Sequence, residues 1–309
     1  MKKWMKPISI LLILLMVTGL GSSALAIEVG EQRVVVGADL TYEQRTQVYA
    51  DFGLSRGLIP EMTVTIGEER AYLQGLVPDS VIGSRSISSI YIMTTRPGSG
   101  LDITINNINW LTREIYVNAL VTAGITDARV IITAPVPVSG TAALTGIYKA
   151  FEDITGEPLP AEAKRVAVEE AVLTGQLADA LGDSEDIAAL INQLKLIMDD
   201  IRTMSDDEVR DEIRNLADQL DLVLTADQIE QILRLARSLQ NLDLGALQGT
   251  LEAIAGNMGR LTELAQSAGG FFAGVTNFFS GAGEFFASVG AFFADLGRAI
   301  SGFFSSLFG

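Results

Sequence analysis

The sequence predicts an α+β protein with an N-terminal α/β domain on a mixed sheet, an all-helical region, and a C-terminal amphipathic helix rich in phenylalanine. Strand and helix patterns alternate at first, which is typical of a sheet covered by helices. The strand pattern stops after Pro158 and Pro160, and paired phenylalanines recur near the C-terminus. We therefore divide the chain into residues 27–157, 158–267 and 268–309, after an N-terminal signal.

Residues 1–26 have the three parts of a cleaved secretory signal. Three lysines come first, an apolar run covers residues 8–20, and Ala24 and Ala26 supply the small residues that a signal peptidase reads. The alternative is a retained membrane anchor, but the apolar run is shorter than the ~20 residues that span a bilayer. We expect cleavage after Ala26 and a secreted or cell-envelope protein.

The composition excludes several classes of function. The chain has 38 acidic and 22 basic side chains, a net charge of −16, which does not suit a partner made of nucleic acid. It contains no cysteine and no histidine. Ser-His-Asp and Cys-His catalysis are therefore excluded, and a zinc site is disfavoured. We expect no metal and no cofactor, and we leave open whether the protein is an enzyme, with a preference for none.

Residues 28–156 combine the periodicities of strands and helices. Thr41 and Gln44 form a capping box at the start of one helix. A turn with Pro and Gly over residues 96–100 predicts a β-hairpin between its flanking strands. The expected strands are 33–37, 62–66, 86–95, 101–110 and 128–134, and the expected helices are 41–52, 68–74, 112–124 and 141–155.

After Pro160 only helical spacing remains, as in a bundle or an array of helical hairpins. Ser205 with Glu208, and Thr225 with Gln228, are two further capping boxes. The acidic pairs near them are interpreted as solvated helix starts and not as metal ligands. The expected helices are 161–181, 185–203, 206–221, 226–240 and 246–266.

The C-terminal segment 268–309 carries the strongest local pattern. Phenylalanine pairs recur at a seven-residue step and then once after an eleven-residue step, which keeps them on one face of a helix. Glu284, Asp295 and Arg298 fall on the opposite face. The members of the apolar face are Phe271, Phe272, Phe278, Phe279, Phe285, Phe286, Phe292, Phe293, Phe303 and Phe304.

This segment requires an apolar surface to remain helical. Each glycine within it costs ~1 kcal/mol relative to alanine, whereas burial of each phenylalanine contributes ~1.5–3 kcal/mol. Three alternatives could supply this apolar surface: a membrane interface, a second copy of the helix, or the protein's own helical region. We prefer the membrane surface, then self-association, then packing within the chain. A transmembrane span is disfavoured because charged residues interrupt the segment.

Four stretches resemble a known family of secreted proteins from Gram-positive bacteria, the domain-of-unknown-function family 1002. They are Gly37–Thr41, Ile82–Ser89, Asn107–Thr112 and the distinctive Pro135–Gly146. The resemblance covers residues 30–240, and the phenylalanine-rich end lies outside it. The family has no established activity, so the resemblance implies export and a fold and assigns no catalytic residue.

The connection between a predicted strand and a predicted helix at residues 137–141 is one candidate site. Backbone N–H groups at the start of this helix would suit an anion. The alternative, which we prefer, is that Ser139 or Thr141 caps the helix and Gly140 permits the turn.

A second candidate site combines Arg85 with Asn106, Asn107, Asn109 and Trp110, which would form a polar groove beside an aromatic ring for a glycan or peptide. The preferred alternative is a solvent-exposed strand face with the indole packed at its end. The candidate ligand-binding residues are Arg85, Asn107, Trp110, Ser139, Gly140 and Thr141; no catalytic residue is assigned.

The preferred function is an exported binding or structural module of the cell envelope or extracellular space, associated with membrane or with itself through residues 268–309. A wall polymer or a peptide is the candidate ligand. The alternative is a secreted, carboxylate-dependent hydrolase acting on a wall glycan or peptide. It would require Arg85, Asn107, Ser139 and an acidic side chain to converge in one cleft.

Overall fold

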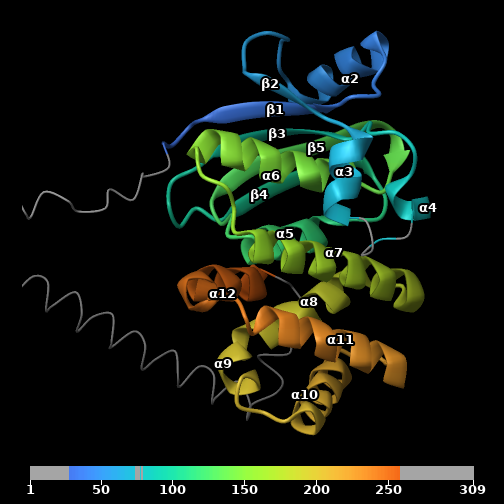
Figure 1. The fold of residues 1–309 in the computed structure, drawn as a ribbon, viewed down its shortest axis with the longest axis vertical. Coiled ribbons are helices and arrows are strands. Elements are labelled where there is room, and N and C mark those ends of the chain that lie inside the picture. The colour runs from blue at the N-terminus through green and yellow to red at the C-terminus, as the bar shows by residue number, and fades with distance from the viewer. Residues whose placement is uncertain (1–27, 74–76, 78, 258–309) are drawn as a thin grey trace, which may run out of the picture.

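A computed structural model describes residues 28–73, 77 and 79–257 of the chain (Figure 1). The predicted signal peptide and the predicted phenylalanine-rich helix lie outside these residues. The strands are β1 (Gln32–Gly37), β2 (Glu61–Val64), β3 (Ser89–Thr94), β4 (Leu101–Ile108) and β5 (Ala128–Val138). The helices of the sheet region are α2 (Tyr42–Phe52), α3 (Ile66–Leu73), α4 (Asp79–Ile82), α5 (Arg113–Thr122) and α6 (Thr141–Thr155).

The strands form one mixed sheet in the order β2-β1-β3-β5-β4. β1 is parallel to β2 and β4 is parallel to β5, while β3 is antiparallel to both of its neighbours. β1, β2, β4 and β5 therefore all run in one direction, and their carboxyl ends share one edge of the sheet. The predicted α+β class with a mixed sheet is confirmed.

The predicted β-hairpin is wrong. β5 lies between β3 and β4, and the connection between them passes the start of β5, where Thr95 N donates to Asp127 O and Ala128 N donates to Gly100 O. β5 takes the inner position because Val130 and Ile132 are completely buried on one face and its other face is largely covered. β4, at the edge of the sheet, exposes alternate side chains, so one of its faces is open to solvent.

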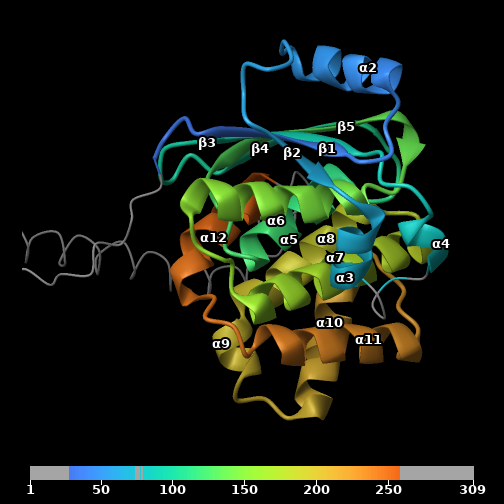
Figure 2. The ribbon, with the colours of Figure 1, turned by 45° about the horizontal axis from the view of Figure 1, so that its top comes forward.

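Helices cover both faces of the sheet (Figure 2). On one face, α2 packs Tyr49 and Phe52 against the buried side chains of Val34 and Val36 in β1. The other face, which includes Val35, packs against α5 and α6 in a larger apolar cluster. The run of consecutive buried residues from Val34 to Gly37 thus reflects a strand covered on both sides.

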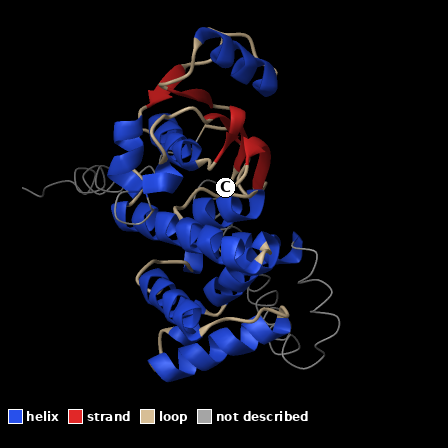
Figure 3. Ribbon diagram, turned by 90° about the vertical axis from the view of Figure 1, so that its right-hand side faces the viewer, coloured by secondary structure: helices blue, strands red, loops and turns tan. Residues whose placement is uncertain are grey.

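Six helices and a short 3₁₀ turn complete the described part of the chain. They are α7 (Ala161–Leu181), α8 (Ser184–Leu196), α9 (Met198–Ile201), α10 (Asp206–Gln219), α11 (Ala226–Leu239), the turn η1 (Gly245–Leu247) and α12 (Gln248–Asn257). The strands lie together toward one end of the molecule, and these helices form the other end (Figure 3). No helix within the described ranges has both the length and the apolar character needed to cross a bilayer.

The capping boxes predicted at Thr41, Ser205 and Thr225 are all confirmed. In each, the side-chain oxygen accepts from the backbone N–H three residues later, and the residue there returns a bond to the cap. One predicted helix differs: the expected 185–203 is divided at Ile197 into α8 and α9. The short helix α4 was not predicted from the sequence.

α7 packs on two sides. Ala167 and Ala171 belong to the apolar cluster beneath the sheet, whereas Leu173 and Leu177 belong to the cluster formed with α8, α10 and α11. The small residues let α7 approach α5 closely, and the leucines fill the space on the other side. The division of the chain at residue 158 stays a prediction. Ala167 and Ala171, which follow the division, belong to the same apolar cluster as residues that precede it.

A buried polar network connects α5, α7 and α8. Lys195 Nζ lies 2.8 Å from Glu170 Oε1 and also donates to Asn118 O and Thr122 Oγ1. Thr122 Oγ1 donates to the second oxygen of Glu170 at 2.5 Å. Burial lowers the pKa of Lys195, and the neighbouring carboxylate opposes that effect. This network fixes the register of the three helices, since a buried charge is tolerated only with its partners in place.

Candidate functional site

Five of the six candidate ligand-binding residues lie around one pocket at the carboxyl edge of the sheet: Arg85, Trp110, Ser139, Gly140 and Thr141. The pocket has a volume of about 440 Å³. Its walls come from the segment 81–88 before β3, the residues after β4, the end of β5 and the start of α6. The anion and groove interpretations therefore concern a single site.

Gly140 shapes the wall of this pocket where β5 passes into α6. Its φ of 95° is in the left-handed region that favours glycine. A Cβ atom there would collide with the Tyr116 hydroxyl and lie 2.6 Å from Ile108 Cγ2. Tyr116 Oη also donates to Gly140 O at 2.6 Å. The turn therefore requires glycine both for its backbone angle and for space, as the sequence predicted in part.

The predicted side-chain cap of α6 is wrong. Gly140 is the N-cap residue, and no side chain accepts from the first N–H groups of this helix. Ser139 Oγ donates instead to Val81 O at 2.9 Å, and Thr141 Oγ1 donates to Glu69 Oε1 at 2.5 Å. The two hydroxyl oxygens lie 3.1 Å apart. The helix has no side-chain cap because its N-cap residue is glycine, which has no side chain to accept a hydrogen bond.

Glu69 is the residue that sequence reasoning missed. It lies in α3, is 1 % exposed and lines the pocket. Burial raises its pKa to about 7, and the hydrogen bond from Thr141 opposes the increase. Its second oxygen, Oε2, is buried without a hydrogen-bond partner among the described residues. A buried acceptor without a donor is costly, so Oε2 has the capacity to accept a hydrogen bond from a group that enters the pocket.

The hydroxyl chain allows Glu69 to be either charged or neutral. When Glu69 is ionised, Thr141 donates to it and Ser139 donates to Val81 O, so no proton lies between the two hydroxyls. When Glu69 is protonated, it can donate to Thr141, Thr141 to Ser139, and Ser139 to the carbonyl. Each of these contacts then carries one proton, which favours the neutral acid.

Arg85 is exposed at the side of the pocket. Its loop is fixed to the end of β1, since Ser86 N donates to Asp39 Oδ2 at 2.7 Å and Asp39 N donates to Ser86 O at 3.0 Å. Gly37 permits this approach, because a Cβ atom on it would overlap the backbone of Ser86. Arg85 forms no ion pair with any residue in the described ranges. Its guanidinium group is therefore free to meet an anion.

Trp110 is half-buried after β4 and both lines the pocket and packs against α7. Its Nε1 donates to Asp179 Oδ2 at 2.9 Å. Gly175 lies beside the ring, where a Cβ atom would be 2.8 Å from Trp110 Cζ2. The packed indole expected from the sequence is observed, and the role of the ring as a ligand platform stays a prediction.

Asn107 does not line the pocket. It has a φ of 58° at an irregularity in the pairing of β4 with β5, and its Nδ2 donates to Ala134 O at 2.8 Å. Asparagine tolerates the left-handed region better than most residues, which explains its presence there. Asn109, two residues later, is the asparagine that reaches the pocket wall.

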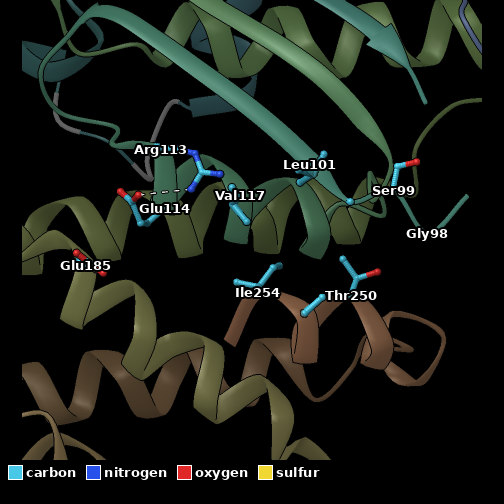
Figure 4. A pocket seen from close by; sticks show the side chains of 11 residues that line it. Gly98, Ser99, Leu101, Arg113, Glu114, Val117, Glu185, Thr250 and Ile254 are labelled. Atoms are coloured by element: carbon cyan, nitrogen blue, oxygen red, sulfur yellow. Dashed lines mark ion pairs between the residues drawn. The ribbon is translucent and has the colours of Figure 1, made fainter. Parts of the chain in front are cut away.

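A second, smaller pocket of about 190 Å³ lies between the turn before β4, the start of α5 and α12 (Figure 4). Arg113 and Thr250 line it from opposite sides. Arg113 Nε donates to Ile103 O, and its guanidinium lies 3.8 Å from Glu114. The arginine of this pocket is thus already held by groups of the chain, whereas five of the predicted residues meet at the larger pocket, so we place the candidate site there.

The acidic pairs of the helical region form ion pairs. Asp199 bonds to Arg202 at 2.6 Å, and Asp206, the first residue of α10, bonds to Arg237 at 2.8 Å. Within the described ranges, no three His, Cys, Asp or Glu side chains converge as metal ligands would. The acidic side chain that faces the candidate site is Glu69.

Residues 36–254 match the family described as Protein of unknown function (DUF1002). The Uncharacterized protein YpuA of Bacillus subtilis (strain 168) is 37% identical to this chain over 247 residues, which cover 79% of this chain and 83% of the relative. No solved structure matches the chain. The matched span begins in β1 and ends in α12, and it includes the pocket. On this evidence the chain belongs to the DUF1002 family of proteins of unknown function.

Proposed function

We propose that this protein is an exported module of the cell envelope or extracellular space that binds a wall polymer or peptide in the carboxyl-edge pocket. The observation that carries the proposal is the buried, unpartnered oxygen of Glu69 in the same cavity as Arg85 and two hydroxyls. In open α/β sheets ligands bind outside the carboxyl ends of the strands. The cavity of about 440 Å³ is also within the usual range for small ligands.

A survey of soluble wall fragments by thermal shift tests this proposal. A binding fragment is expected to raise the unfolding temperature of the protein. The variant Ser84→Trp, which adds a large side chain at an exposed position in the pocket wall, is expected to lose the effect. Ser99→Trp, in the exposed turn before β4, is the matched control and should keep it. Equal stabilisation of both variants would exclude this pocket.

The export part of the proposal is supported by the pattern of residues 1–26, and the membrane or self-association part by the phased phenylalanines of residues 268–309. Liposome flotation of the protein, compared with a version ending at Ser267, tests the second part. We expect the longer protein to float and the shorter one to remain below. Equal flotation would remove this segment from membrane binding, and light scattering on the same samples would detect self-association.

A carboxylate-dependent hydrolase is the second candidate, and Glu69 is the observation that favours it. A carboxyl group with a pKa of about 7 can serve as a general acid or base near neutral pH. Glycoside hydrolysis generally uses two carboxyl groups, and within the described part of the chain Glu69 is the only acidic residue in the wall of this pocket. Binding is therefore preferred to catalysis. Release of soluble fragments from purified cell wall, abolished by Glu69→Gln, would reverse the preference.

A further inference from the structure

We propose that the ligand of this pocket is a small zwitterion, a free amino acid or a di- or tripeptide, with its ammonium group against Glu69 and its carboxylate beside Arg85. The inference rests on the proposed binding function and specifies its ligand. The proposed ligand is therefore a peptide or an amino acid, and binding of a neutral saccharide in its place would contradict the inference.

The part of the pocket wall formed by Glu69 favours a hydrogen-bond donor. Glu69 is 1 % exposed, and one of its oxygens accepts from Thr141 while the other, Oε2, has no partner among the described residues. A primary ammonium group supplies three donors and a charge of opposite sign. In a site sheltered from water, this charge-assisted bond is stronger than a bond from a neutral hydroxyl.

The part of the pocket wall formed by Arg85 favours an acceptor with negative charge. Arg85 is exposed there and has no carboxylate partner in the described ranges, although the chain has 38 acidic against 22 basic side chains. The first turn of α6, which includes Thr141 and Ala142, also faces the pocket with no side chain capping it. Guanidinium and helix-start N–H groups both favour a carboxylate.

Charge balance then favours a ligand with both groups. Among the residues that the structure describes, Glu69 and Arg85 are the only ionisable ones that line this pocket. An anion alone would leave Glu69 Oε2 without a donor, and a cation alone would leave Arg85 without an acceptor. The cavity of about 440 Å³ limits the ligand to a few residues when both of its ends are held inside.

Isothermal titration with alanylalanine, in its L,L and D,D forms, tests the inference on the full chain. The N-acetylated and C-amidated dipeptides are the matched ligands, each lacking one charge. We expect at least one stereoisomer to bind and either modification to weaken binding tenfold or more. Equal binding of free and modified dipeptides, or no binding of either stereoisomer, would overturn the inference.

Two variants assign the ends of the ligand. In Glu69→Gln, N-acetylation should no longer weaken binding, and in Arg85→Gln, C-amidation should no longer do so. Arg96→Gln, exposed in the turn before β4, is the control and should behave as the parent protein. Circular dichroism of each variant establishes that it is folded. Unchanged sensitivity in both variants would overturn the assignment.

The neutral disaccharide N,N′-diacetylchitobiose separates this inference from the proposed function. If it binds, loses binding in Ser84→Trp, and the dipeptides do not bind, the ligand class is wrong while the pocket remains a binding site. If wall fragments bind equally to the parent and to Ser84→Trp, the proposed function itself fails.

Discussion

Replacing Glu69 with glutamine should stabilise the protein at neutral and alkaline pH. Glutamine has the same shape and can still accept from Thr141, but it cannot become charged. Arg70, the next residue on the same helix, attracts the carboxylate of Glu69, but this attraction does not offset the effect of burial on its pKa. The substitution therefore removes a buried negative charge and little else.

The magnitude follows from the pKa. Burial raises the pKa of Glu69 from 4.5 to about 7, and each factor of ten in proton affinity corresponds to about 1.4 kcal/mol. Because the folded state holds the proton more tightly, the stability from this group is complete below pH 4.5 and is lost as the pH rises to 7. The parent should therefore lose about 3 kcal/mol over this interval relative to Glu69→Gln.

Urea denaturation of both proteins at pH 4, 6 and 8 measures this difference. The two free energies of unfolding should nearly coincide at pH 4, and the variant should be the more stable by about 2 kcal/mol at pH 6 and about 3 kcal/mol at pH 8. Glu162→Gln, at an exposed residue of α7, is the control. A constant difference across the three pH values would refute the buried position of Glu69.

Three other substitutions test the packing. Gly140→Ala should cost ~3 kcal/mol or more by urea denaturation, since it adds a collision to a positive φ, whereas Gly156→Ala, with open space around it, should cost ~1 kcal/mol; equal costs would contradict the packing at Gly140. Lys195→Met should cost ~3–5 kcal/mol, and adding Glu170→Met should recover part of it, because the single variant leaves a buried charge unpaired; a double variant no more stable than the single one would contradict this. Thr225→Ala should cost ~1 kcal/mol through loss of the cap, and an unchanged midpoint would contradict the capping box.

Local signals predicted most of the fold. The capping boxes at Ser205 and Thr225 and the apolar spacing of α7 are contained in short stretches of sequence, so the helices begin where expected. The pairing of strands is not local. The turn at residues 96–100 has the glycines of a hairpin and connects β3 to β4. However, β5, almost thirty residues later, lies between these two strands in the sheet. The pairing of β5 with both β3 and β4 outweighed the local turn.

The candidate site was predicted in part for the same reason. Arg85, Trp110 and Ser139 were identified from separate stretches, and the shared carboxyl edge of the strands brings them together. Glu69 was missed because it follows Glu68 on a short helix, where two successive acids are normally solvated. The available signal was its position five residues after the end of a strand parallel to β1. Side chains at such positions face the edge of the sheet where ligands bind.

The most direct test of the proposed binding site is an NMR titration of the isotope-labelled protein with soluble wall fragments. The binding proposal predicts that the amide shifts that move first belong to residues 83–88, 109–110 and 138–142, which surround the pocket. Changes confined to the smaller pocket near Arg113 and Thr250, or no changes at any concentration, would contradict it.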